Sequence, residues 1–155
     1  MSTEIEKHKN PYDILMNIIQ DAAAATQQDE SRKFPELFLQ KLEEAYGQDR
    51  DEIEKLFVDA FTAGKEQGVE LFVLKHLWVL PMDEISKSRL LTACLLKEKE
   101  GRIRQYISAI FDINERDERS HIEKVKEAGK VFGRVDRMRT KMKKERGIRI
   151  IPVKK

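Results

Sequence analysis

A proline-free, highly charged stretch, residues 114–147, most constrains what this chain can fold into. It reads NERDERSHIEKVKEAGKVFGRVDRMRTKMKKERG. Its apolar residues recur three or four positions apart, which is the spacing of one face of a helix. Acidic residues crowd the first half and basic residues the second, an order that suits the helix dipole at both ends. The stretch therefore predicts one long helix over residues 114–147 with a basic second half.

The apolar face of this predicted helix does not run straight. Steps of three and of four residues rotate it in opposite directions, so the face turns past Gly129 and Gly133. Each glycine inside a helix costs about 1 kcal/mol relative to alanine. We interpret the pair as a place where a neighbouring helix packs closely, with a hinge as the alternative. Because Val135, Met138 and Met142 would face away from whatever covers the first half, they predict an interface with a second copy of the chain.

The rest of the chain is also expected to be helical. The 155 residues include only seven glycines and four prolines, and the composition favours helices over strands. The run Val69–Leu80 has enough β-branched and aromatic residues for a buried strand, but no partner strand follows within hairpin distance. We interpret it as a central buried helix. Turn and cap signals predict further helices over about residues 11–25, 35–46, 50–64, 84–100 and 103–111.

The predicted fold class is an all-α, single-domain bundle of about six helices. Residues 1–113 form its helical core, residues 114–147 form the long helix, packed on the core or on a partner, and residues 148–155 form a short, extended basic tail. Residues 82–92 have a faint likeness to the first helix and turn of a helix-turn-helix. The apolar run that follows nevertheless favours one unbroken helix over 84–100, stopped by Gly101.

Candidate catalytic and metal sites are weak. Cys94 lies in an apolar run without a neighbouring base, as expected of a small buried hydrophobe. Glu118 and His121 have the spacing found in helical di-iron sites, but no second copy of the motif occurs. A helical nucleotide hydrolase would need paired acidic motifs, whereas Glu66 and Glu70 stand alone. The sequence therefore predicts a non-enzymatic protein without cofactor or metal, with a helical metal- or nucleotide-dependent hydrolase as the remaining enzyme alternative.

The cellular location is predicted from what the chain lacks. One cysteine permits no internal disulfide, which suits a reducing compartment. The start MSTEIEKHKN has no apolar core for a signal peptide, and the most apolar run, residues 69–80, is too short to cross a membrane. We expect a cytoplasmic protein with no membrane contact.

The strongest functional signal is the charge asymmetry. Residues 1–60 hold 7 basic and 14 acidic side chains, whereas residues 130–155 hold 11 basic and 2 acidic ones. A basic helix and tail predict sequence-nonspecific binding to a nucleic-acid backbone, and the alternative is docking on an acidic protein surface or self-association through the same helix. The candidate binding residues are Arg134, Arg137, Arg139, Lys141, Lys143, Lys144, Arg146 and Arg149.

Overall fold

A computed structural model describes residues 10–113 and 118–147 of the chain, with backbone only for residues 118–120. Every regular element in these residues is a helix, which confirms the all-α prediction and the long C-terminal helix. The predicted extended tail, residues 148–155, lies outside the described residues. None of the described helices is both long and apolar enough to span a membrane. The helices are α2 Pro11–Gln28, α3 Phe34–Tyr46, α4 Arg50–Lys65, α5 Glu70–Trp78, α6 Glu84–Cys94, α7 Glu100–Ile110 and α8 Glu118–Glu145.

The helices divide into two compact units, Met1–Asp83 with α2 to α5 and Glu84–Lys155 with α6 to α8. The prediction from the sequence had a helical core over residues 1–113 and the long helix after it. The division falls earlier because α6 and α7 both pack on α8. Each unit is described below by itself.

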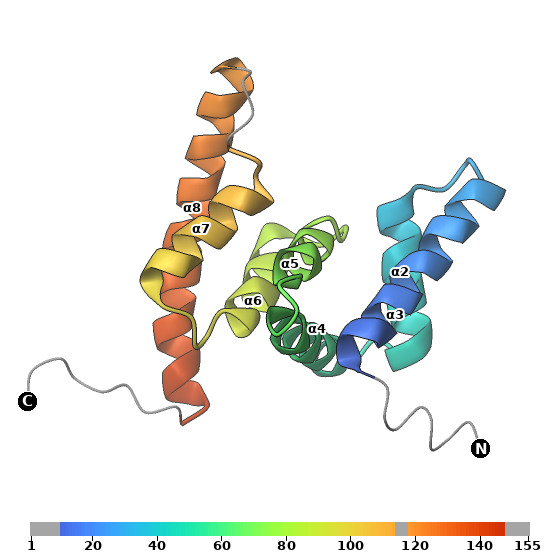
Figure 1. The fold of residues 1–155 in the computed structure, drawn as a ribbon, viewed down its shortest axis with the longest axis horizontal. Coiled ribbons are helices and arrows are strands. Elements are labelled where there is room, and N and C mark those ends of the chain that lie inside the picture. The colour runs from blue at the N-terminus through green and yellow to red at the C-terminus, as the bar shows by residue number, and fades with distance from the viewer. Residues whose placement is uncertain (1–9, 114–117, 148–155) are drawn as a thin grey trace, which may run out of the picture. The chain divides into compact units, whose positions relative to one another are not determined.

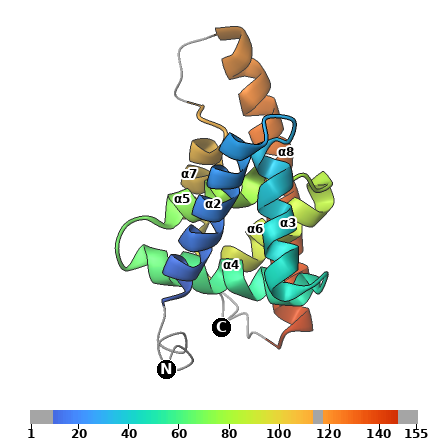
Figure 2. The same cartoon turned by 90° about the vertical axis from the view of Figure 1, so that its right-hand side faces the viewer.

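In the first unit, α2 and α3 lie side by side and α4 packs across them (Figure 2). Asn10 begins α2 as predicted, because its side-chain oxygen accepts a hydrogen bond from the Tyr12 backbone N–H at 2.7 Å and Pro11 follows it. The apolar faces of the three helices meet in a core of fully buried side chains. Its largest members include Leu15, Phe38, Leu42, Ile53 and Phe57.

The run Val69–Leu80 is helical, because α5 spans most of it. A tight turn joins α4 to α5, in which the Val69 N–H donates to the Gly64 carbonyl at 2.9 Å and Gly68 has a φ of +74°. A Cβ added at Gly64 would lie 3.4 Å from the backbone N and Cα of Glu70. A Cβ at that distance would just make van der Waals contact, so the close approach of α5 to the end of α4 leaves little room for a larger side chain at Gly64.

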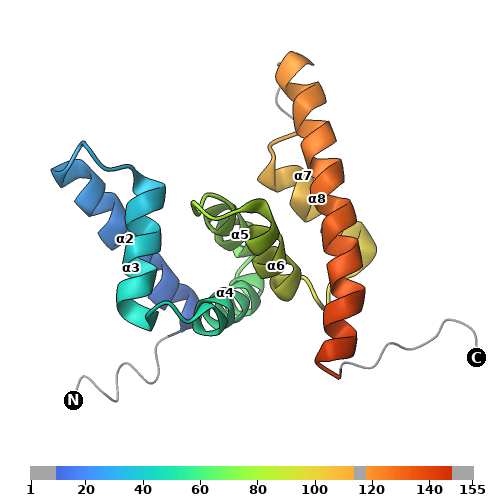
Figure 3. The ribbon, with the colours of Figure 1, turned by 180° about the vertical axis from the view of Figure 1, so that it is seen from behind.

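In the second unit, α7 crosses α8 (Figure 1). The view from behind shows that the longer helix α8 extends beyond α7 at both ends (Figure 3). The prediction of an unbroken helix over residues 84–100 is wrong. α6 ends at Cys94, and Gly101 lies in the first turn of α7 instead of stopping a helix. The apolar run misled the prediction because Leu95 and Leu96 are buried in the turn that follows α6 rather than on a helix face.

Candidate functional site

The inner face of α8 is formed by Ala128, Val131, Val135 and Met142, each at most 6% exposed. α7 packs on the first half of this helix and α6 on the second. A different helix therefore covers the apolar face after it turns. Met138 also contacts its own unit, because its sulfur lies 3.7 Å from the buried Thr92 hydroxyl oxygen. No second subunit is needed to cover Val135, Met138 or Met142, and the geometric argument for an interface there does not hold.

The two glycines of α8 do not mark close packing within the described part of the chain. A Cβ added at Gly129 would meet nothing within 4 Å, and one at Gly133 would meet only the end of the Arg137 side chain, at 3.5 Å. Their predicted role as a contact with a neighbouring helix of the same chain is therefore wrong. α6 and α7 pack on α8 around Ala128 and Val135 instead of against the glycines, which the sequence period did not reveal.

Arg139, one of the predicted binding residues, makes structural contacts within its own unit. Its guanidinium donates hydrogen bonds to three backbone carbonyls, those of Leu95 at 3.1 Å, Leu96 at 3.3 Å and Glu98 at 2.6 Å. These carbonyls belong to the turn between α6 and α7, where a helix end leaves backbone acceptors without intrahelical partners. Arg139 therefore holds the end of α6 against α8.

Arg134 is also engaged inside the second unit. Its Nη1 atom donates to the Ser88 hydroxyl at 3.2 Å and lies 3.5 Å from Oε1 of Glu84. Lys143 is partly buried, and this burial, followed by the nearby charge of Arg139, lowers its pKa. Of the other predicted residues, Arg146 is exposed just past the end of α8, and Arg149 lies outside the described residues.

Five further basic residues of α8 form an exposed stripe. Successive residues of an α-helix are about 100° apart, so these five positions fall within about 60° of the helix circumference, opposite the buried face. They span about 27 Å along the axis at 1.5 Å per residue. None of the five makes an ion pair or hydrogen bond with another described residue. The stripe, called here the basic stripe, consists of Lys126, Lys130, Arg137, Lys141 and Lys144, all exposed.

Sequence reasoning identified three members of the stripe and missed Lys126 and Lys130. The signal was present, because Lys126 precedes Arg137, and Lys130 precedes Lys141, by eleven residues. Eleven residues make about three helical turns, which returns a side chain to the same face. Basic residues three and four positions apart pointed to Arg134 instead.

The one Phe, Trp or Tyr in the α8 sequence, Phe132, is already in contact with Arg104. Phe132 is partly buried, and the Arg104 guanidinium lies 4.1 Å from the centre of its ring. Because a cation occupies one face of the ring and part of the side chain is buried, little of Phe132 is left for a base to stack on. The stripe therefore offers charge without an aromatic platform.

The other candidate residues are placed as follows. His76 lies among the rings of Phe34, Phe38 and Phe72, with Nδ1 2.9 Å from the Phe72 carbonyl oxygen. Cys94 is buried. The Glu118 side chain lies outside the described residues, so its pairing with His121 is not tested. Within the described ranges, no cluster of three or more His, Cys, Asp or Glu side chains has an arrangement that could hold a metal ion.

Comparisons of the chain with protein-family models, with curated proteins and with solved structures found no match.

Proposed function

We propose that the second unit binds nucleic acid through its phosphate backbone, using the basic stripe. The observation that carries this proposal is the row of five exposed cations on one face of α8, none of them neutralised by a described side chain. A polyanion that contacts such a row releases condensed counterions, which supplies most of the free energy of non-specific binding.

The chemistry of the stripe favours contacts to phosphates over contacts to bases. Four of its five members are lysines, which act as point charges, and bidentate base recognition depends on planar groups placed in a groove. The partly buried Phe132 is covered by Arg104, so base stacking has no support there. Binding is therefore proposed to be indifferent to base sequence.

The charge distribution assigns this role to the second unit. Residues 1–60 carry twice as many acidic as basic side chains, and such a surface repels a phosphate backbone.

We place the protein in the cytoplasm because its single cysteine suits a reducing compartment, and we propose a binding role without turnover.

The test is a binding titration of the full chain with a duplex of mixed sequence at several salt concentrations. If all five cations contact phosphates, the logarithm of the affinity should fall with the logarithm of salt with a slope of about −4.5. Replacing Arg137, Lys141 and Lys144 together by Glu should abolish measurable binding. The three side chains are exposed, so circular dichroism should show an unchanged helix content.

A matched control carries the same change in net charge elsewhere. Lys33, Lys55 and Lys97 are exposed and lie outside the stripe, so replacing these three by Glu should lower the affinity far less. Equal losses in the two triple variants would mean that net charge alone attracts the nucleic acid, and the stripe would not be the site. Binding that ignores salt would also refute the proposal.

A further inference from the structure

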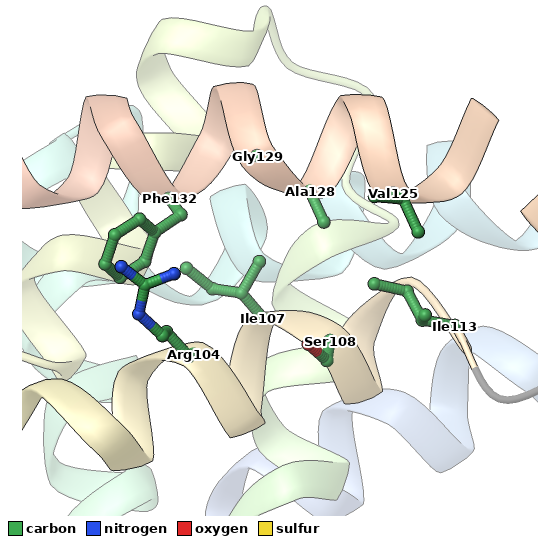
Figure 4. Close-up of a pocket in the computed structure, with 8 residues that line it drawn as sticks. All are labelled: Arg104, Ile107, Ser108, Ile113, Val125, Ala128, Gly129 and Phe132. Atoms are coloured by element: carbon green, nitrogen blue, oxygen red, sulfur yellow. The ribbon is translucent and has the colours of Figure 1, made fainter. Parts of the chain in front are cut away.

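A groove runs between α7 and the first half of α8 in the second unit (Figure 4). Ile107 of α7 and Ala128 of α8 point toward each other in it, and Val125 and Phe132 extend from α8 on either side. The groove holds about 200 Å³. Among the described residues that line it, only Arg104, at the Phe132 end, is charged, and its guanidinium also lies 3.9 Å from Glu100.

Apolar side chains at this groove remain open to solvent. Val125 is 45% exposed, and Ile122, one helical turn before it, is 56% exposed. Gly129 extends the open surface, because a Cβ there would meet no described atom within 4 Å. A large exposed aliphatic pair beside a groove and an uncovered helix backbone is typical of a docking surface for another helix.

The basic residues around the groove indicate which kind of partner fits it. On the α8 side, Lys126 and Lys130 are exposed about 100° further around the helix than Val125 and Gly129, so they flank the open apolar surface. Arg104, which is paired with Glu100, lies on the α7 side. A second copy fits poorly. Antiparallel pairing of two α8 helices through this face would bring the same basic edges together, and parallel pairing would bring their basic second halves together.

We propose that this groove docks an acidic amphipathic helix of a partner protein. Apolar side chains of that helix enter between Val125 and Phe132, and its backbone passes close to Gly129. Its carboxylates face Arg104, Lys126 and Lys130. The site is separate from the contacts made by the C-terminal half of the basic stripe, but an acidic partner and nucleic acid would compete for the two lysines.

The probe is a synthetic amphipathic helix with leucines three and four residues apart on one face and glutamates on the other, labelled for fluorescence anisotropy and titrated with the full chain. The wild type should bind it. The same peptide with lysine in place of each glutamate should bind about tenfold more weakly or not at all. No binding of the acidic peptide, or equal binding of both peptides, would overturn the proposal.

Two variants locate the peptide on the groove. Val125→Glu adds a charge to the apolar surface and Gly129→Leu fills it, and each should weaken binding by about tenfold or more. Ile85→Glu is the matched control, because Ile85 is 62% exposed on α6 outside the groove lining and the change in charge is the same. Equal affinity of Val125→Glu and wild type would place the peptide elsewhere and refute the proposal.

The two sites are distinguished by exchanging variants and ligands. Val125→Glu should keep nucleic-acid binding, and the triple change at Arg137, Lys141 and Lys144 should keep peptide binding within about threefold. Analytical ultracentrifugation completes the test. A wild-type dimer that Val125→Glu dissociates would show that a second copy occupies the groove, which would overturn the proposal of an acidic partner.

Discussion

Arg139 provides the sharpest test of how the second unit is held together. The perturbation is Arg139→Ala, which removes one guanidinium from the three backbone carbonyls of Leu95, Leu96 and Glu98. The Leu95 carbonyl keeps one backbone partner, the Glu98 N–H at 3.2 Å, so the loss comes mainly from the charged hydrogen bonds that the guanidinium donates. The variant should lose stability although α8 itself keeps its helix-forming residues, because alanine is the best helix former.

The size of the effect follows from the geometry. The bonds to Leu95 at 3.1 Å and Glu98 at 2.6 Å are well formed, whereas the bond to Leu96 at 3.3 Å shares its donor nitrogen and is weak. A hydrogen bond to a charged group contributes about 1.5–3 kcal/mol net, and part of Arg139 is open to water. We therefore expect a loss of about 3 kcal/mol in the free energy of unfolding.

The assay is urea unfolding followed by circular dichroism, with two companion variants. Arg139→Lys should lose about half as much, because an ammonium cannot reach three carbonyls with the fixed geometry of a guanidinium. Arg137→Ala should change stability by less than about 0.5 kcal/mol, since Arg137 is exposed on the basic stripe. Equal stability of the Arg139→Ala and Arg137→Ala variants would refute the reasoning.

Two further predictions concern the first unit. Gly64→Leu should lower the free energy of unfolding by more than about 2 kcal/mol, because even a Cβ would touch the Glu70 backbone at 3.4 Å; a thermal melt like that of the wild type would contradict this contact. Burial, and then the charge of Glu52, raise the pKa of Tyr46 above its ordinary value of 10.0. The unfolded chain then loses this proton at lower pH than the folded chain, so stability should fall as the pH rises above about 10, and less steeply in Tyr46→Phe. Parallel pH profiles of wild type and Tyr46→Phe in urea unfolding would show that Tyr46 does not contribute.

Local signals predicted most of the helices. Asn10 and Pro11 begin α2, and Gly47, with a φ of +69°, closes α3. These effects act within one turn of the chain, so they can be read without knowing the fold. The run Val69–Leu80 was correctly interpreted as a helix because no partner strand lies nearby in sequence.

The basic face of α8 could be predicted only in part. Composition placed the positive charge in the last 26 residues, and helical spacing found Arg137, Lys141 and Lys144. Arg134 and Arg139 carry the same charge and lie on the same helix as these residues. Both nevertheless donate hydrogen bonds within the unit, to α6 and to the turn after it. Residues more than forty positions apart in sequence make these contacts, so no local pattern reveals them.

The sequence by itself determined that the chain is helical, where most helices begin and which end of α8 is basic, since propensity, capping and charge are properties of neighbouring residues. The tertiary structure decided which side of α8 is covered. Packing by α6 and α7 buries Val135 and Met142 and leaves Ile122, Val125 and the basic stripe exposed. A helix with apolar residues on more than one side offers several faces for packing, and only its neighbours in three dimensions select the one that is buried.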